Sequence, residues 1–229
     1  MWIALFSPRS TGKSVAAWWL LHALHARGYP VLGVDADESK QMYRWWEAQF
    51  PADDDQEEGD EFEAPFEVHR MADSRFHEQA ADMLPPGHIG VVDVGHLENH
   101  SAIGLSVMRV VDLALITCAP TAGDVERMDD LPMDFFIERG IKKRPAGAPE
   151  PERWILFTRN QLGATRAVKE LRTSLGDDGW NILSTVIPAT QTYSSTGEGV
   201  EIYAPGSHFD ELVTELETKG LLDKRMVTE

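Results

Sequence analysis

A glycine–lysine–serine triplet close to the N-terminus carries the clearest chemical signature in the chain. Gly12, Lys13 and Ser14 follow an apolar run at residues 2–6 and precede a helix-like run at residues 15–27. In this strand–loop–helix setting, successive backbone N–H groups and the helix N-terminus wrap an anion. The lysine then reaches the terminal phosphates, and the serine hydroxyl binds Mg²⁺. The triplet therefore predicts a nucleotide phosphate site.

The loop departs from the full phosphate-loop pattern at its first glycine. That pattern has a glycine five residues before Gly12, where this chain has Ser7. An ordinary serine-capped helix start is the alternative interpretation. The strand-to-helix junction favours a phosphate site, and we expect the nucleotide to be bound by Pro8, Arg9, Ser10, Thr11, Gly12, Lys13, Ser14 and Val15.

Acidic residues end two of the apolar runs that follow. Asp35 closes the run at residues 31–34, and Asp93 comes late in the run at residues 89–94. An apolar strand that finishes in Asp, well downstream of a phosphate loop, is where such folds hold the water shell of Mg²⁺. The sequence thus predicts that Asp93 takes part in a metal site with Ser14.

Apolar runs and helix-like segments alternate along the whole chain. We expect strands at 2–6, 31–35, 66–69, 89–94, 112–120, 154–158 and 182–187, and helices at 15–27, 41–50, 74–84, 121–139, 162–175 and 209–219. This alternation predicts an α/β fold with a mostly parallel, twisted sheet flanked by helices on both faces. Ligands of such sheets bind at the carboxyl ends of the strands, where segments 7–14, 35–37 and 93–95 would converge.

Length and composition favour one globular domain. The chain has 229 residues, of which 42% are hydrophobic, and we expect a single domain at residues 1–229 with an acidic, solvated insertion at 51–65. A single cysteine, Cys118, excludes an intramolecular disulfide framework. No apolar run approaches the length of a membrane span, and no secretory signal is visible, so a cytoplasmic location is expected.

The net charge of −17 opposes indiscriminate binding of nucleic acid by the whole surface. A local basic patch is still compatible with that charge. Arg166, Lys169 and Arg172 fall along one side of a predicted helix, and Lys142, Lys143 and Arg144 form a second cluster. A solvated helix face with no binding role is the alternative.

Four motifs together resemble the ParA/MinD branch of P-loop ATPases over nearly the whole chain. Residues 31–39 resemble the Asp-x-Asp motif of the second strand, and residues 91–93 resemble the Walker B strand. Residues 111–121 and 185–188 resemble two later strands, the last of which ends in Ile-Pro. The Asp-Ala-Asp-Glu segment with a tryptophan soon after is also similar to ParA-like accessory ATPases of conjugative and T-DNA transfer.

The resemblance implies an ATP-sandwich homodimer with Mg²⁺. In the family pattern Ser14 and the acids, here Asp35 and Asp93, hold the metal, partly through water. Asp37 matches the acid that orients the attacking water, and Lys13 offsets charge on the phosphates. The ends of the late strands supply the adenine contacts in this family. We therefore expect Thr158, Arg159 and Pro188 to contact the base.

The chain departs from the family at the signature lysine of the phosphate loop. That lysine reaches across the dimer to the partner's phosphates, and this chain has Pro8 in its place. Arg9 is one residue away and could supply the cation in trans, because a guanidinium forks well onto phosphate. If Arg9 points to solvent instead, cross-dimer activation is lost. We therefore expect slow ATP hydrolysis.

The sequence therefore favours a ParA-like ATPase of plasmid or chromosome partition. We expect ATP-dependent dimerisation, non-specific DNA binding and a ParB-like partner that triggers release. Two alternatives keep the fold and the nucleotide: an accessory ATPase of DNA transfer with a relaxase-type partner, and a nucleotide-binding scaffold with little or no hydrolysis. A metabolic enzyme of the dethiobiotin-synthetase type also shares the fold, but no residue signature for an acceptor pocket is apparent.

Overall fold

The described part of the chain is built around a parallel sheet. The computed structural model describes residues 1–51, 64–130, 133–161, 163–197 and 201–222. The strand order is β3-β2-β4-β1-β5-β6-β7, and every neighbouring pair is parallel. The strands are β1 (Trp2–Phe6), β2 (Val31–Ala36), β3 (Glu67–Arg70), β4 (Ile89–Val94), β5 (Leu113–Cys118), β6 (Glu152–Asn160) and β7 (Ile182–Pro188). The predicted fold class is confirmed.

The central strands β1, β2, β4 and β5 are buried at every position because the sheet is covered on both faces, and most of their residues are apolar. Alternate residues of β1 enter different cores: Ile3 and Leu5 pack on one face, whereas Ala4 and Phe6 pack on the other. Successive side chains of a strand point to opposite faces, so a strand buried on both sides reads as a continuous apolar run. This is why short apolar runs of the sequence located the four central strands β1, β2, β4 and β5.

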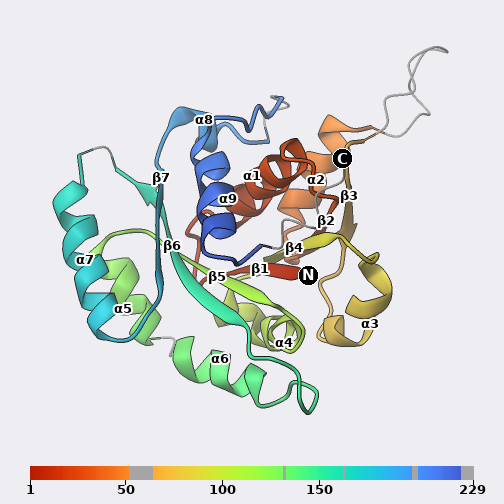
Figure 1. The fold of residues 1–229 in the computed structure, drawn as a ribbon, viewed down its shortest axis with the longest axis horizontal. Coiled ribbons are helices and arrows are strands. Elements are labelled where there is room, and N and C mark those ends of the chain that lie inside the picture. Colours follow the sequence, from red (N-terminus) through yellow and green to blue (C-terminus); the bar gives the residue numbers. More distant parts are fainter. Residues whose placement is uncertain (52–63, 131–132, 162, 198–200, 223–229) are drawn as a thin grey trace.

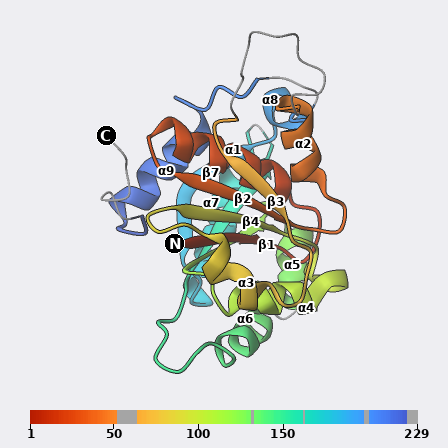
Figure 2. The same cartoon turned by 90° about the vertical axis from the view of Figure 1, so that its right-hand side faces the viewer.

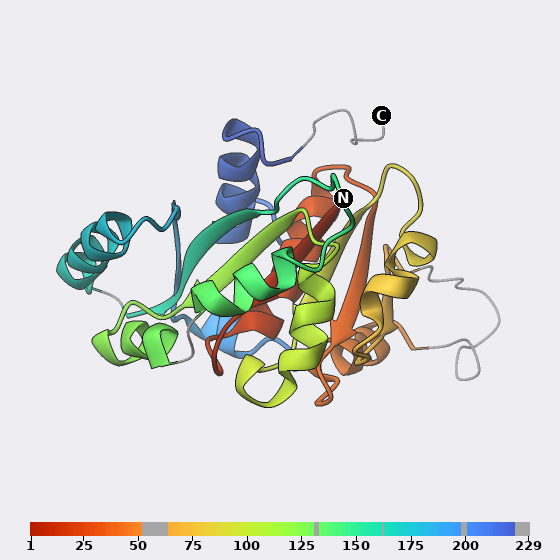
Figure 3. The ribbon, with the colours of Figure 1, turned by 90° about the horizontal axis from the view of Figure 1, so that it is seen from below.

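The helices form one layer on each face of the sheet (Figures 1 and 2). The first layer packs against Ile3 and Leu5 and contains α1 (Lys13–Ala26), α2 (Gln41–Gln49) and α9 (His208–Thr218). The opposite layer, seen in front of the sheet in Figure 3, contains α3 (Phe76–Met83), α4 (Leu97–Met108), α5 (Ala122–Asp130), α6 (Met133–Ile141) and α7 (Thr165–Asp177). A one-turn helix, α8 (Gln191–Ser194), follows β7.

The structure corrects the predicted helices in three places. The single helix expected at 121–139 is two helices, α5 and α6, with residues 131–132 outside the described part. Helix α4 and the one-turn α8 were not predicted. The predicted acidic insertion at 51–65 lies, from residue 52 to residue 63, outside the described residues.

Strand register brings the predicted functional segments to one edge of the sheet. Asp35 of β2 pairs with Asp93 of β4, and Asp93 also pairs with Leu5 of β1. Because β1 ends at Phe6, the phosphate loop starts at Ser7, two residues beyond Leu5. The carboxyl ends of β1, β2 and β4 therefore meet, as the alternation of strands and helices predicts.

Among the described residues, none of the helices combines the length and the apolar character that crossing a membrane requires.

Candidate functional site: a nucleotide cavity at the carboxyl edge of the sheet

The loop between β1 and α1 turns sharply into the helix at Gly12. This residue has φ 86°, a left-handed conformation that glycine adopts without steric cost. Its carbonyl accepts the first helical bond from the Ala16 N–H at 2.9 Å. The helix N-terminus, with its unpaired N–H groups, therefore begins directly at the loop. This is the geometry that an anion site at a helix start requires.

Two threonines from neighbouring strands hold the loop in place. The hydroxyls of Thr11 and Thr117 are 2.5 Å apart, and Thr117 lies in β5. The Thr158 hydroxyl in β6 donates to the Thr11 carbonyl at 2.7 Å. Both strand threonines are buried. Thr158, predicted as an adenine contact, thus also supports the loop, and Thr117 was not predicted because only sheet pairing brings β5 beside residue 11.

The Lys13 ammonium lies inside the loop. Its Nζ donates to the Ser7 Oγ at 2.8 Å and to the Arg9 carbonyl at 3.2 Å, while the Ser7 hydroxyl itself donates to that same carbonyl. Burial lowers the pKa of Lys13, and the carboxylates of Asp93 and Asp37 oppose this shift. The serine that replaces the first glycine of the pattern therefore acts as a direct partner of the lysine.

Asp35 is a buried acid that organises the segment after β2. One of its carboxylate oxygens accepts from the Asp37 N–H at 3.0 Å, and the other accepts from the Tyr43 N–H at 2.9 Å. Burial raises the pKa of Asp35, and these backbone bonds oppose the rise. Asp37 in turn accepts from the Ser39 N–H at 3.0 Å and borders the cavity described below.

Asp93 is fully buried; its carboxylate interacts with the Ser14 hydroxyl, but neither oxygen makes a well-formed hydrogen bond with a described residue. Burial raises the pKa of Asp93 to about 7, the charge of Asp35 adds to the rise, and the charge of Lys13 and the Ser14 hydroxyl oppose it. Burying a carboxylate without well-formed hydrogen bonds costs free energy unless a cation binds to it. The described residues hold no group of three or more His, Cys, Asp or Glu side chains placed for a metal. A cation here must therefore complete its shell with other oxygens.

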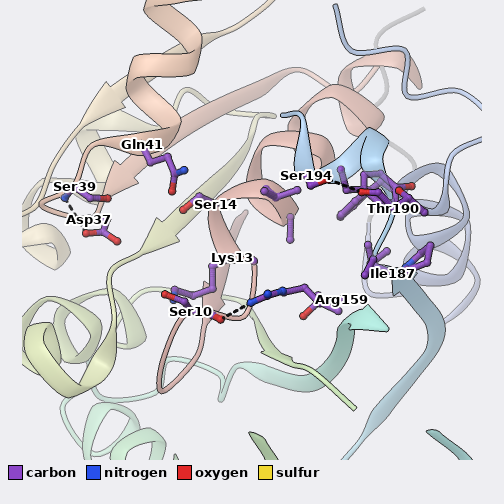
Figure 4. Close-up of a pocket in the computed structure, with 18 of the residues that line it drawn as sticks. Ser10, Lys13, Ser14, Asp37, Ser39, Gln41, Arg159, Ile187, Thr190 and Ser194 are labelled. Carbon is purple, nitrogen blue, oxygen red and sulfur yellow. Dashed lines mark hydrogen bonds between the residues drawn. The ribbon is translucent and has the colours of Figure 1, made fainter. Parts of the chain in front are cut away.

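A cavity of about 960 Å³ opens above the loop (Figure 4). Its walls come from the phosphate loop and α1, from the segment after β2, from the end of β6, and from β7 and α8. Eight of the predicted nucleotide contacts line it: Ser10, Gly12, Lys13, Ser14, Val15, Thr158, Arg159 and Pro188. Asp37 lines it as well, whereas Pro8, Arg9, Thr11, Asp35 and Asp93 are not among its lining residues.

The wall opposite Asp37 was only partly predicted. It contains residues that the sequence analysis did not name: Ile187, Ala189, Thr190, Gln191, Tyr193, Ser194 and Phe209. The hydroxyl of Thr190 is buried without a hydrogen-bond partner among the described residues. The signal for this wall was available, because residues 189–191 directly follow the last strand and must lie at the same sheet edge as the loop.

Pro8 and Arg9 stand where the sequence predicted a departure from the family. Pro8 is buried, and Arg9 is exposed. The Arg9 Nε donates to the Glu98 carboxylate of α4 at 2.7 Å, and the neighbouring Ser10 hydroxyl lies 3.1 Å from the His96 ring. The loop therefore contacts α4 and the residue before it within its own chain.

The predicted basic patch does not form a single surface of unpaired cations. Arg172 donates to the carbonyls of Leu183 and Ser184 in β7, and Arg144 donates to the carbonyls of Met108 and Val111. Arg166 pairs with Glu170 at 2.7 Å and Lys142 with Glu138 at 3.6 Å. The guanidinium groups of Arg172 and Arg144 therefore hold neighbouring backbone segments in place. This corrects their assignment to a patch of cations that are available to DNA.

Comparison with known proteins identifies the fold. No protein-family model matches the chain, and no curated protein matches it. Solved structures do: a putative plasmid partition protein of Borrelia burgdorferi B31 bound to AMPPNP shares 13% identity over 96% of this chain and 98% of that chain, with a TM-score of 0.68. A ParA family ATPase from Chlorobium tepidum TLS shares 17% identity over 95% and 98%, with a TM-score of 0.63.

A third neighbour is the septum site-determining protein MinD from Pyrococcus horikoshii OT3, complexed with Mg-ADP. It shares 17% identity over 98% of this chain and 96% of that chain, with a TM-score of 0.63. The structural neighbours are thus ParA and MinD type ATPases over nearly the full length, at low sequence identity. The chain has the P-loop NTPase fold of these proteins, which confirms the predicted resemblance at the level of the fold.

Proposed function

We propose that this chain is a ParA-like ATPase that binds ATP with Mg²⁺ and dimerises in the ATP-bound state. One observation carries the proposal: the loop with Lys13, the acid Asp37 and the buried acid Asp93 all belong to one sheet edge beside a single large cavity. Similarity of fold to proteins solved with AMPPNP and with Mg-ADP supports a nucleotide as the ligand.

The two ends of the cavity suit the two ends of a nucleotide. The phosphate end is lined by Gly12, Lys13 and Ser14 at the start of α1, and the far end by apolar groups such as Ile187 and Pro188. Cavities of 300–1,000 Å³ with mostly apolar walls and a few convergent polar groups are typical of small-molecule sites. We therefore place the triphosphate at the loop and the base against β7 and α8.

The donor set fits Mg²⁺. A hard cation that keeps several waters needs few protein oxygens, and Asp93 offers a buried carboxylate on the strand next to the loop. Ser14 would bind the ion directly, with Asp93 and Asp35 acting through water. The ion would neutralise charge that builds up on the phosphate oxygens.

Asp37 is the residue we propose to orient the attacking water. Its carboxylate lines the cavity and is held by the Ser39 N–H, and the Asp35 carboxylate accepts from the Asp37 N–H. Phosphoryl transfer needs an in-line nucleophile and charge neutralisation more than covalent help. Lys13 supplies the positive charge at the phosphates, after exchanging its present partners in the loop for phosphate oxygens.

For the cellular role we propose plasmid or chromosome partition, with non-specific DNA binding and a ParB-like partner. A neighbour of this fold is named a putative plasmid partition protein, which supports the proposal by similarity of fold. Exposed basic residues that remain for DNA are Lys169 and Lys143, together with Arg166 and Lys142, whose surface ion pairs are weak enough for phosphate to displace.

The second candidate function is that of a nucleotide-binding scaffold with little hydrolysis, and two features of the phosphate loop favour it. The position of the signature lysine is a buried proline, and the nearest substitute, Arg9, is bound to Glu98 of its own chain. An accessory ATPase of DNA transfer, with a relaxase-type partner, would share both features. Stimulation of turnover by a cognate centromere-binding protein is expected only for the partition role.

The decisive experiment measures the mass in solution without nucleotide, with ADP, and with ATP plus Mg²⁺, and follows phosphate release in the same samples. A dimer that forms only with ATP and releases phosphate is the result we expect. A dimer without release would identify the scaffold. Lys13→Ala serves as the matched control and should abolish both responses. If the wild-type protein responds to ATP in neither measurement, the proposed function is wrong.

A further inference from the structure

The cavity contains a second cation besides Lys13. Arg159 lies at the end of β6 and lines the cavity, and its guanidinium Nη1 donates to the Ser10 carbonyl of the phosphate loop at 3.2 Å. Figure 4 shows the Arg159 side chain extending toward Ser10 and Lys13. We propose that Arg159 binds the phosphate chain of the nucleotide within its own subunit. The inference rests on the proposed function and differs from the predicted contact of Arg159 with the base.

The backbone at Arg159 supports a functional position. Its φ is 53°, and Lys40 is the other non-glycine residue with positive φ in the described part of the chain. An arginine gains nothing sterically from this left-handed conformation, and such strain concentrates at ligand clamps and active sites. The side-chain stem also runs over the loop: a Cβ placed on Gly12 would be 3.6 Å from the Arg159 Cγ.

The cations around the loop differ in how far they are already engaged. Lys13 donates to two oxygens of the loop, and Arg9 is paired with Glu98. Among the described residues, Arg159 donates a hydrogen bond to a neutral carbonyl and has no ion pair with a carboxylate. A guanidinium carries five N–H donors, so most of the donors of Arg159 remain for an anion. Its planar fork matches phosphate oxygens.

The direction of the side chain separates a phosphate contact from a base contact. Arg159 starts near the β7 wall, where the strand pairing places Asn160 beside Pro188, but its head reaches the loop and bonds Ser10. In Figure 4, Ile187 lies on the side of Arg159 away from Ser10, and both Ile187 and Pro188 line the cavity. Arg159 therefore supplies in cis part of the positive charge that Pro8 cannot provide.

The test compares equilibrium binding of ATP and of inorganic tripolyphosphate to wild-type protein and variants. Arg159→Ala should weaken the binding of both ligands about 10-fold or more, because a charge-assisted bond is lost. Arg159→Lys should recover part of the loss. Arg159→Gly should match the alanine variant in binding and also relieves the backbone strain, so folding is preserved. Arg75→Ala changes an exposed arginine that precedes α3 and does not line the cavity, so it is the matched control and should bind both ligands like wild type.

The outcomes separate this inference from the proposed function. If Arg159→Ala weakens ATP but not tripolyphosphate, Arg159 contacts the base and the inference is overturned. Unchanged affinity for both ligands overturns it too. If wild-type protein binds tripolyphosphate too weakly to measure, the salt dependence of ATP affinity decides: it flattens in Arg159→Ala for a phosphate contact and stays the same otherwise. A wild-type protein that binds no ATP refutes the proposed function itself.

Discussion

At Asp93 the structure places a charge that costs stability in the absence of its ligand. The carboxylate is fully buried and interacts with the Ser14 hydroxyl, but neither oxygen makes a well-formed hydrogen bond with a described residue. An ionised carboxylate with few partners is among the most expensive groups to desolvate. We therefore expect a ligand from outside the chain to compensate for the burial of Asp93. Removing this charge should therefore raise the stability of the protein without ligand and weaken its binding of nucleotide.

We predict that Asp93→Asn stabilises the protein without ligand at pH 8 and removes Mg²⁺-dependent ATP binding. The folded-state pKa of about 7 exceeds the ordinary value of 3.8. The folded state thus holds its proton longer, and the wild type loses stability as pH rises from about 4 to about 7. The variant lacks this loss, which amounts to about 2–4 kcal/mol. Thermal unfolding of both proteins at pH 5 and pH 8 measures it, and a wild type more stable than the variant at pH 8 would contradict the prediction.

Arg9 and Glu98 form an ion pair that competes with any role of Arg9 across a dimer. The pair is exposed, with 53% and 34% of the side chains accessible, so it adds little to stability. If Arg9 acts on the partner's phosphates, Glu98→Gln should raise ATP turnover by freeing the guanidinium. Arg9→Ala should lower turnover, by about 10³-fold if Arg9 acts as a full arginine finger. Steady-state phosphate release measures both, and turnover of Arg9→Ala equal to wild type would refute the role.

At the scale of elements, the sequence predicted the strands better than the helices. A strand buried on both faces, such as β5, leaves a short continuous apolar run that few other structures produce. Helix α4 was not predicted because four polar residues follow Leu97 in its first half and Gly104 interrupts the apolar residues of its second half. Pro132 lies between α5 and α6, so the sequence does hold a signal for two helices, which the prediction of a single helix overlooked.

The candidate site was predictable where it depends on strand ends and unpredictable where it depends on tertiary contacts. The positions of Lys13, Asp37 and Asp93 follow from the rule that ligands bind at the carboxyl ends of parallel strands. The partnership of Arg9 with Glu98 spans 89 residues, and that of Arg159 with Ser10 spans 149. Such contacts depend on side-chain rotamers and helix placement, for which a single sequence carries no pattern.

The pairing of β1 with β4 leads to a prediction about strand packing. Gly90 lies directly opposite Trp2, and a Cβ at Gly90 would overlap the indole ring, which packs edge-on against Phe76 at 5.3 Å. Gly90→Ala should therefore destabilise the protein by about 1–3 kcal/mol, because the rigid ring must shift in a filled core. Chemical denaturation measures the free energy of unfolding.

A double variant separates this overlap from the loss of a flexible glycine. If overlap with the indole ring causes the loss of stability, Gly90→Ala should lower the free energy of unfolding far less in a Trp2→Leu background. The effects of the two substitutions should then be strongly non-additive. Gly87→Ala is no suitable control, since Gly87 has φ 82°, whereas Gly123→Ala adds a Cβ with nothing within 4 Å and should cost little. Additive effects of the two substitutions would contradict the assigned contact.

At the scale of the whole molecule, the distribution of charge determines which surface can bind DNA. The chain carries a net charge of −17, so its mean field repels the phosphate backbone. The two predicted basic clusters differ in place: Lys142 follows α6, whereas Lys169 lies in α7, and Figure 1 shows these helices as separate elements. DNA binding therefore requires the exposed side of α7 to overcome the general repulsion, or a dimer that brings two such sides together.

If α7 binds DNA, affinity in the ATP-bound state should fall steeply with salt. Each phosphate neutralised contributes a slope of about −0.9 in the logarithm of affinity against that of salt. Lys169→Glu combined with Arg166→Glu should therefore weaken binding and flatten the slope by about 2 per subunit. Lys142→Glu, in the other cluster, is the matched charge control and should change the slope little if α7 forms the contact. Fluorescence anisotropy with a DNA duplex at several salt concentrations measures all three proteins. A flat response of wild type would exclude α7 as a DNA surface and leave nucleotide-controlled dimerisation to act through protein partners alone.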